Sequence, residues 1–131
     1  MKILVAYDGS PHAKRALLHT AELVGRGGTI TVVNVIPTQA VSSRLETVSD
    51  GERDRQRSVL REARALLAEQ KIEMKPVAAV GDPTTEIRAA AEESGAGIVV
   101  VGRGKGTRRL IHGSVSTRLV RRAPCDVRVV H

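Results

Sequence analysis

Short apolar runs alternate with helical patterns along this chain, and that alternation limits the fold more than any other feature. The runs are rich in Val and Ile and end at Gly, Pro or Asp, which is typical of buried strands. They cover residues 3–6, 29–36, 72–80, 98–101 and 127–130. Strands that alternate with helices form parallel sheets with right-handed crossovers. The pattern therefore predicts a single α/β domain over residues 1–131, with a three-layer, doubly wound parallel sheet of five strands.

Two of the expected helices share one kind of start. Ser10-Pro11 and Asp82-Pro83 each place an N-cap residue before a proline at the first helical position. Apolar periodicity then predicts helices over 11–24 and 83–94, and two more over 53–70 and 114–122. The polar segment 37–51 has no clear period and is expected to be irregular. Pro76 removes a ladder donor, so the third strand should lie at a sheet edge.

The composition excludes several classes of protein. Hydrophobic residues make up 41% of the chain, but Phe and Trp are absent and Tyr7 is the only aromatic residue. A core of Val, Ile, Leu and Ala suits a parallel sheet that is buried on both faces. Sites for single-stranded nucleic acid usually stack bases on aromatic rings, so nucleic acid is an unlikely partner on this ground.

The cysteine content and the hydropathy of the chain indicate its cellular location, and the spacing of its histidines bears on metal binding. The single Cys125 cannot form an internal disulfide, and no apolar run is long enough to span a membrane. The first apolar run meets Asp8 too soon for a signal peptide. We expect a soluble, cytoplasmic protein with no membrane partner. His12 and His19 lie seven positions apart, and we interpret them as surface histidines, because no zinc-type spacing is present.

The C-terminal third carries the pattern of an anion site. The fourth apolar run ends at Gly102, further glycines follow, and Gly113-Ser114 precedes a helical pattern. Glycines let backbone N–H groups approach a phosphate, and a helix N-terminus adds partial positive charge. Residues 1–100 are neutral overall, so the whole net charge of +7 lies in residues 101–131. We therefore expect an anionic ligand near this end of the chain.

The first and fourth strands are expected to share the ligand crevice. Ligands of doubly wound sheets bind beyond the carboxyl ends of the strands, where the strand order reverses. Asp8 follows the first strand and Gly102 ends the fourth. If these strands are neighbours, both loops line one crevice.

The familiar phosphate and hydrolase motifs are absent. The sequence GRGKGT lacks the order of a P-loop, and the glycines at 102, 104 and 106 lack the spacing of a dinucleotide fingerprint. No G-x-S-x-G elbow is present. Because no motif places a general base, we expect no enzyme activity beyond slow ATP hydrolysis or self-phosphorylation.

The chain as a whole resembles the universal stress protein family. The resemblance rests on ILVAYDGS, VVNVI, VGDP and the tail VVVGRG…GSVSTRLVRRAPCDVRVV, in that order over nearly all residues. It implies a Rossmann-like fold of the adenine nucleotide alpha hydrolase type with sheet order 3-2-1-4-5. It also implies a small stress-response regulator that binds ATP, with ADP or AMP as alternatives and Mg²⁺ only as a companion of the nucleotide.

The resemblance further implies which residues contact the nucleotide. Asp8 would lie near the base or ribose, although Asp in such a turn also serves to close it. Val35 would offer backbone groups to adenine, Val101 and Gly102 would contact ribose and the first phosphate, and the start of the last helix would hold the phosphates. The full set of expected site residues is Tyr7, Asp8, Val35, Val101, Gly102, Gly104, Gly113, Ser114, Val115 and Ser116.

The glycine loop departs from the pattern of the ATP-binding branch. That pattern is G-x2-G-x9-G-[ST], whereas Gly102, Gly104 and Gly113-Ser114 give G-x-G-x8-G-S, one residue shorter in each gap. One alternative is therefore a nucleotide-free dimeric interaction module of the same family. Another is nucleic-acid binding through the basic C-terminal face, motivated by charge alone.

A homodimer is expected through the last strand. Residues 126–130 alternate polar and apolar, as an edge or pairing strand does, and an unprotected edge invites a partner strand. The resemblance implies the same assembly.

Overall fold

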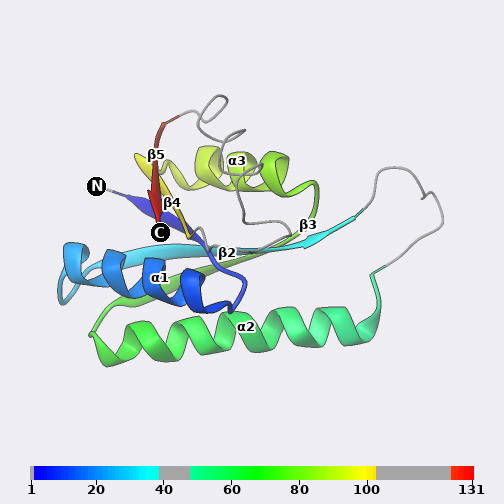
Figure 1. Ribbon diagram of the computed structural model, residues 1–131, viewed down its shortest axis with the longest axis horizontal. Coiled ribbons are helices and arrows are strands. Elements are labelled where there is room, and N and C mark those ends of the chain that lie inside the picture. Colours follow the sequence, from blue (N-terminus) through cyan, green and yellow to red (C-terminus); the bar gives the residue numbers. More distant parts are fainter. Residues whose placement is uncertain (1, 39–47, 103–124) are drawn as a thin grey trace.

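The computed structural model describes residues 2–38, 48–102 and 125–131. In this part of the chain strands and helices alternate as expected (Figure 1). The elements are β1 (Ile3–Ala6), α1 (Pro11–Val24), β2 (Thr29–Pro37), α2 (Asp50–Glu69), β3 (Glu73–Gly81), α3 (Pro83–Ser94), β4 (Ile98–Gly102) and β5 (Asp126–Val130). The helix expected over 114–122 lies outside the described residues.

The five strands form one parallel sheet in the order β3-β2-β1-β4-β5. The order 3-2-1-4-5 is confirmed, and β1 and β4 are neighbours. The central strand β1 places Val5 between Val32 of β2 and Val100 of β4. The strand order reverses between β1 and β4, which is the position where a doubly wound sheet is expected to bind its ligand. Pro76 lies on β3 at the sheet edge, which confirms its predicted position.

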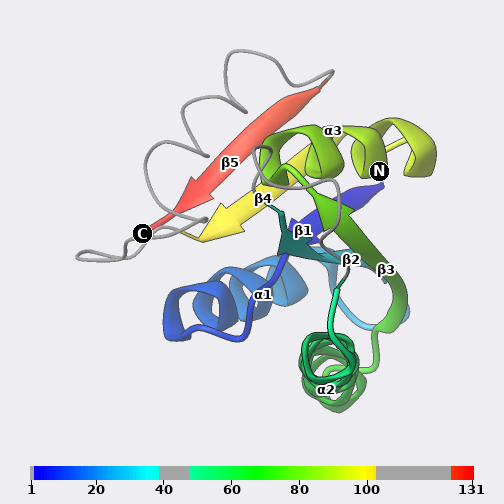
Figure 2. The same cartoon turned by 90° about the vertical axis from the view of Figure 1, so that its right-hand side faces the viewer.

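Helices cover both faces of the sheet. α1 and α2 lie on one face and α3 lies on the other (Figure 2). Successive side chains of β1 point to opposite faces, so Val5 packs into the core under α1 and α2, and Leu4 packs into the core under α3. Both side chains are fully buried. The core contains Val, Ile, Leu, Ala and one Met, with Tyr7 as its single ring, as the composition predicted.

The expected helix starts at Ser10 and Asp82 are confirmed, and the expected start of α2 is wrong. Ser10 Oγ accepts a hydrogen bond from the backbone N–H of Ala13 at 3.2 Å, and α1 begins with Pro11. α2 begins at residue 50 instead of residue 53 because Ser49 and Glu52 form a capping box. Residues 50 and 51, which were expected to be irregular, are therefore helical.

Gly102 occupies a position where no side chain fits. A Cβ on this residue would lie 2.5 Å from the carbonyl oxygen of His12 and 2.8 Å from its carbonyl carbon. The end of β4 therefore packs directly on the backbone of the first turn of α1. Packing alone requires a glycine at the point where the expected anion loop begins.

We predict that Gly102→Ala destabilises the protein by about 1–3 kcal/mol, because the new methyl group meets backbone that cannot rotate away. Urea unfolding of both proteins measures the difference. Gly51→Ala is the matched control: its Cβ meets only Ser49 Oγ at 3.9 Å, and the change should stabilise α2 by about 0.5–1 kcal/mol. Equal stabilities for Gly102→Ala and the native protein would contradict the close packing.

Candidate functional site

Asp8 lies where β1 ends and the chain turns into α1. Its Oδ1 atom accepts hydrogen bonds from the backbone N–H of Ser10 at 2.9 Å and from Ser10 Oγ at 2.6 Å. Asp8 therefore closes the turn, as Asp often does. It also lines three neighbouring hollows at the carboxyl edge of the sheet. Asp8 therefore both holds the turn after β1 and lines the hollows at this edge of the sheet.

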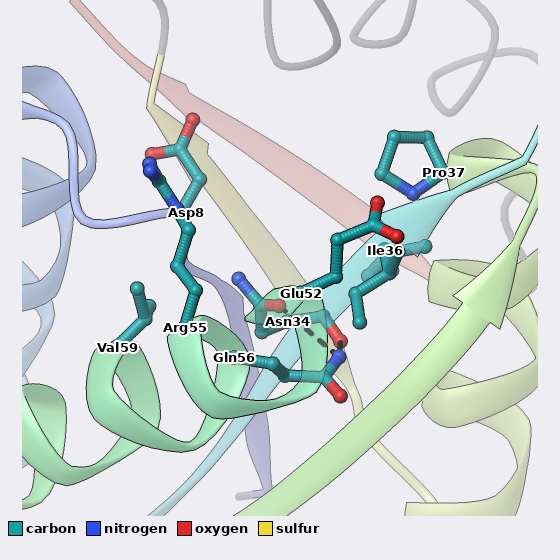
Figure 3. A pocket seen from close by; sticks show the side chains of 9 residues that line it. Asp8, Asn34, Ile36, Pro37, Glu52, Arg55, Gln56 and Val59 are labelled. Atoms are coloured by element: carbon teal, nitrogen blue, oxygen red, sulfur yellow. Dashed lines mark hydrogen bonds between the residues drawn. The ribbon is translucent and has the colours of Figure 1, made fainter. Parts of the chain in front are cut away.

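One hollow lies between the ends of β1 and β2 and the first turns of α2 (Figure 3). Its volume is about 440 Å³, within the range of about 300–1,000 Å³ that is usual for small-molecule sites. Its walls combine carboxylates, an arginine, buried amides and aliphatic side chains. The lining residues are Asp8, Asn34, Val35, Ile36, Pro37, Glu52, Arg55, Gln56 and Val59.

A second, small hollow of about 30 Å³ lies on the α3 side of the same strand ends. Tyr7, Asp8 and Val35 all line it, with Pro83 and Ile87 from α3. The structure thus brings together three of the expected site residues. Asp8 and Val35 belong to both hollows.

A buried amide network forms the floor between these hollows. Asn34 Nδ2 donates to the carbonyl oxygen of Tyr7 at 2.8 Å. Gln56 Nε2 lies 3.0 Å from the carbonyl oxygen of Asn34, 3.1 Å from its Oδ1 and 3.0 Å from the carbonyl oxygen of Ala79. Sequence analysis missed both residues. The signal was present, since an amide within the apolar run TITVVNVI needs a partner when it is buried.

Tyr7 lines the small hollow, but its ring belongs to the core. The side chain is 1% exposed, and its hydroxyl donates to Glu62 Oε1 at 2.6 Å. Glu62 Oε2 in turn lies 3.6 Å from Lys14 Nζ, which joins α2 to α1. Burial raises the pKa of Tyr7, and the hydrogen bond and negative charge of Glu62 raise it further. The ring is not available to a ligand.

Val101 and Gly102 lie at the carboxyl end of β4, next to β1 as expected. Val101 is fully buried in the core under α3, so its side chain is not available to a ligand. The other expected residues, Gly104, Gly113, Ser114, Val115 and Ser116, lie outside the described residues. The described part of the site is therefore the wall formed by β1, β2, α2 and the end of β4.

Among the described residues, no cluster of metal ligands surrounds His12, His19 or Cys125. His12 is only 8% exposed, so its assignment to the surface is wrong; it sits in the first turn of α1 against the end of β4. His19 Nε2 lies 3.0 Å from an Arg128 nitrogen. Burial, followed by the charge of Asp126, raises the pKa of the half-buried Cys125 thiol. Within the described ranges, no three His, Cys, Asp or Glu side chains gather in a way that could hold a metal ion.

Among α1, α2 and α3, none is long and apolar enough to cross a membrane.

The fold and site together define a doubly wound α/β protein with hollows at the carboxyl edge of its sheet, beside the ends of β1 and β2. A model of the universal stress protein family matches residues 1–131. The universal stress protein YxiE of Bacillus subtilis is 30% identical, with 98% of this chain and 97% of that protein covered. The chain belongs to the universal stress protein family.

Solved structures agree with the fold. The universal stress protein UspA of Lactobacillus plantarum superposes with a TM-score of 0.79 at 20% identity, covering 100% of this chain and 97% of the other. The universal stress protein of Archaeoglobus fulgidus in complex with dAMP gives a TM-score of 0.78 at 24% identity, with 100% and 98% covered. Two other neighbours were determined with cAMP and with AMP.

The environment of Tyr7 predicts its titration. Tyr7 is the only tyrosine, so absorbance at 295 nm reports its ionisation directly. The folded protein should keep a neutral phenol above pH 10, whereas the protein in guanidinium should titrate near the ordinary value of about 10. A raised folded pKa favours the neutral form, so this contribution to stability is complete below pH 10 and is lost as pH rises toward the folded pKa. Half-ionisation near pH 10 while circular dichroism stays native would contradict the buried Tyr7–Glu62 contact.

Proposed function

We propose that this protein is a small stress-response regulator that binds ATP or a related adenine nucleotide at the carboxyl edge of the sheet. The observation that carries the proposal is the placement of Asp8 and Gly102 at the ends of β1 and β4, where the strand order reverses. Val35, at the end of β2, lines the same edge. Structural neighbours that hold dAMP, cAMP or AMP support an adenine ligand.

The roles within the proposed site follow from the chemistry of each group. Asp8 presents a carboxylate to the base or ribose while its Oδ1 holds the turn. The main chain of Val35 faces the adenine edge, and the main chain at residues 101 and 102 faces the ribose and first phosphate. Gly104 and residues 113–116 supply N–H and hydroxyl groups to the phosphates, with Mg²⁺ as a companion of the bound nucleotide. The role is that of a regulator, with no catalytic residue assigned.

We expect the melting temperature to rise saturably with Mg-ATP. A ligand that binds only the folded state adds about 2.7 kcal/mol at 100 times its dissociation constant, which is a shift of several degrees for a domain of this size. AMP should also raise the melting temperature, and inorganic phosphate alone should not. Differential scanning fluorimetry measures all three.

The matched variant is Asp8→Asn, which keeps an oxygen for Ser10 and removes the charge. It should melt close to the native protein without ligand and show a smaller shift with ATP. A flat response of the native protein up to millimolar ATP would overturn nucleotide binding. It would favour the nucleotide-free interaction module suggested by the shorter spacing between Gly102 and Gly113.

We propose that the protein acts in the cytoplasm as a homodimer joined through β5. β5 is an edge strand on which Asp126 and Arg128 are exposed and alternate with half-buried valines. Such an edge offers unpaired backbone groups to a second strand.

Sedimentation equilibrium should therefore give twice the mass of one chain at micromolar concentration. In the dimer, the outward N–H groups of residues 126–130 should exchange with deuterium more slowly than in diluted protein. A monomeric mass at all concentrations would contradict the assembly.

A further inference from the structure

A protein that binds adenine usually offers the base a flat surface, and this chain has almost no rings to provide one. It contains no Phe or Trp, and its single tyrosine is 1% exposed with its hydroxyl bound to Glu62. The planar amides of Asn34 and Gln56 at the described part of the site are held in the buried network, whereas the guanidinium of Arg55 takes no part in it. Guanidinium groups are flat, weakly hydrated and stack well on aromatic rings.

Arg55 is placed to act as that surface. It lines the 440 Å³ hollow and a neighbouring hollow of about 350 Å³, and Asp8 and Val59 line both with it. Figure 3 shows the Arg55 side chain extending from α2 toward the Asp8 end of the hollow. Ile36 lines the larger hollow and supplies an apolar wall.

Arg55 takes part in neither of the two ion pairs that the described residues of α2 form. Arg57, two positions along the helix, pairs with Asp54. Among the residues that the structure describes, no carboxylate lies within ion-pair distance of the Arg55 guanidinium. Asp8 directs its Oδ1 to Ser10, and no described group hydrogen-bonds to its second oxygen. Both side chains therefore retain hydrogen-bonding capacity at the rim of one hollow.

The charges of the two hollows favour a base over a phosphate beside Arg55. Among the residues that the structure describes, three carboxylates line these hollows, those of Asp8, Glu52 and Glu62, and Arg55 is the single cation. This balance repels a polyphosphate. It suits a neutral ring whose amino group donates to a carboxylate.

We propose that the Arg55 guanidinium is the stacking surface for adenine, with the free oxygen of Asp8 accepting a hydrogen bond from the adenine amino group. This inference rests on the proposed adenine-nucleotide function and assigns the base-reading residue within it. Arg55 is thereby a specificity-determining residue that the family resemblance does not supply.

The test compares dissociation constants of adenosine, AMP and ATP by isothermal titration calorimetry for the native protein, Arg55→Met and Arg55→Lys. Methionine keeps the length of the side chain and removes the charge, and lysine keeps the charge and removes the plane. Stacking predicts that both variants weaken all three ligands by a similar factor of about 10. Arg53→Met is the matched control, because Arg53 lies on the same helix and lines neither hollow, and its affinities should equal those of the native protein.

The outcomes separate this inference from the proposed function. Native affinity for all ligands in Arg55→Met would overturn the role of Arg55 and leave nucleotide binding intact. A loss that grows from adenosine to ATP and is restored in Arg55→Lys would also overturn it, since that pattern marks a phosphate contact. Failure of the native protein to bind any of the three ligands would overturn the proposed function and the stacking role together. Hypochromism of the bound base near 260 nm that disappears in Arg55→Lys would be an independent sign of stacking.

Discussion

The buried amide pair of Asn34 and Gln56 is the interaction on which the geometry of the site depends. Asn34 donates to the carbonyl oxygen of Tyr7 on β1, and Gln56 of α2 donates to acceptors on β2 and β3. Leaving one such buried acceptor unpaired costs about 1–3 kcal/mol, so the three strand ends and the helix have one favourable arrangement. Asp8 directly follows Tyr7 and Arg55 directly precedes Gln56. The network therefore sets the positions of Asp8 and Arg55, two of the three charged residues that line the 440 Å³ hollow.

The near absence of aromatic residues affects both the core and the site. Small side chains let the helices approach the sheet closely, as Ala13 and Ala16 of α1 show by being fully buried. The contact between Gly102 and the backbone of His12 is the closest form of this packing. The single aromatic side chain, that of Tyr7, packs in the core, where its hydroxyl donates a hydrogen bond to Glu62 of α2. In the proposed site, the groups that can contact a base are therefore the main chain of Val35, the carboxylate of Asp8 and the guanidinium of Arg55.

Two separate arguments favour the carboxyl edge of the sheet as the location of the proposed ligand. One is membership of the universal stress protein family, and the other is the strand order. The sheet order places the ends of β1 and β4 side by side at the reversal point, independently of any relative. The net charge of +7, which the sequence carries beyond residue 100, is of the sign that an anionic partner requires.

The sequence by itself determined the α/β class, the strand and helix order, the edge position of Pro76 and the family, because these depend on local periodicity and on motifs that keep their order. It also indicated Asp8 and Val35. Only the tertiary structure decided which side chains meet. The start of α2 depended on a reciprocal bond between Ser49 and Glu52, and the burial of His12 depended on the approach of β4 to α1. Asn34, Gln56 and Arg55 are far from Asp8 in the chain and join it through strand order and helix packing, which no local pattern encodes.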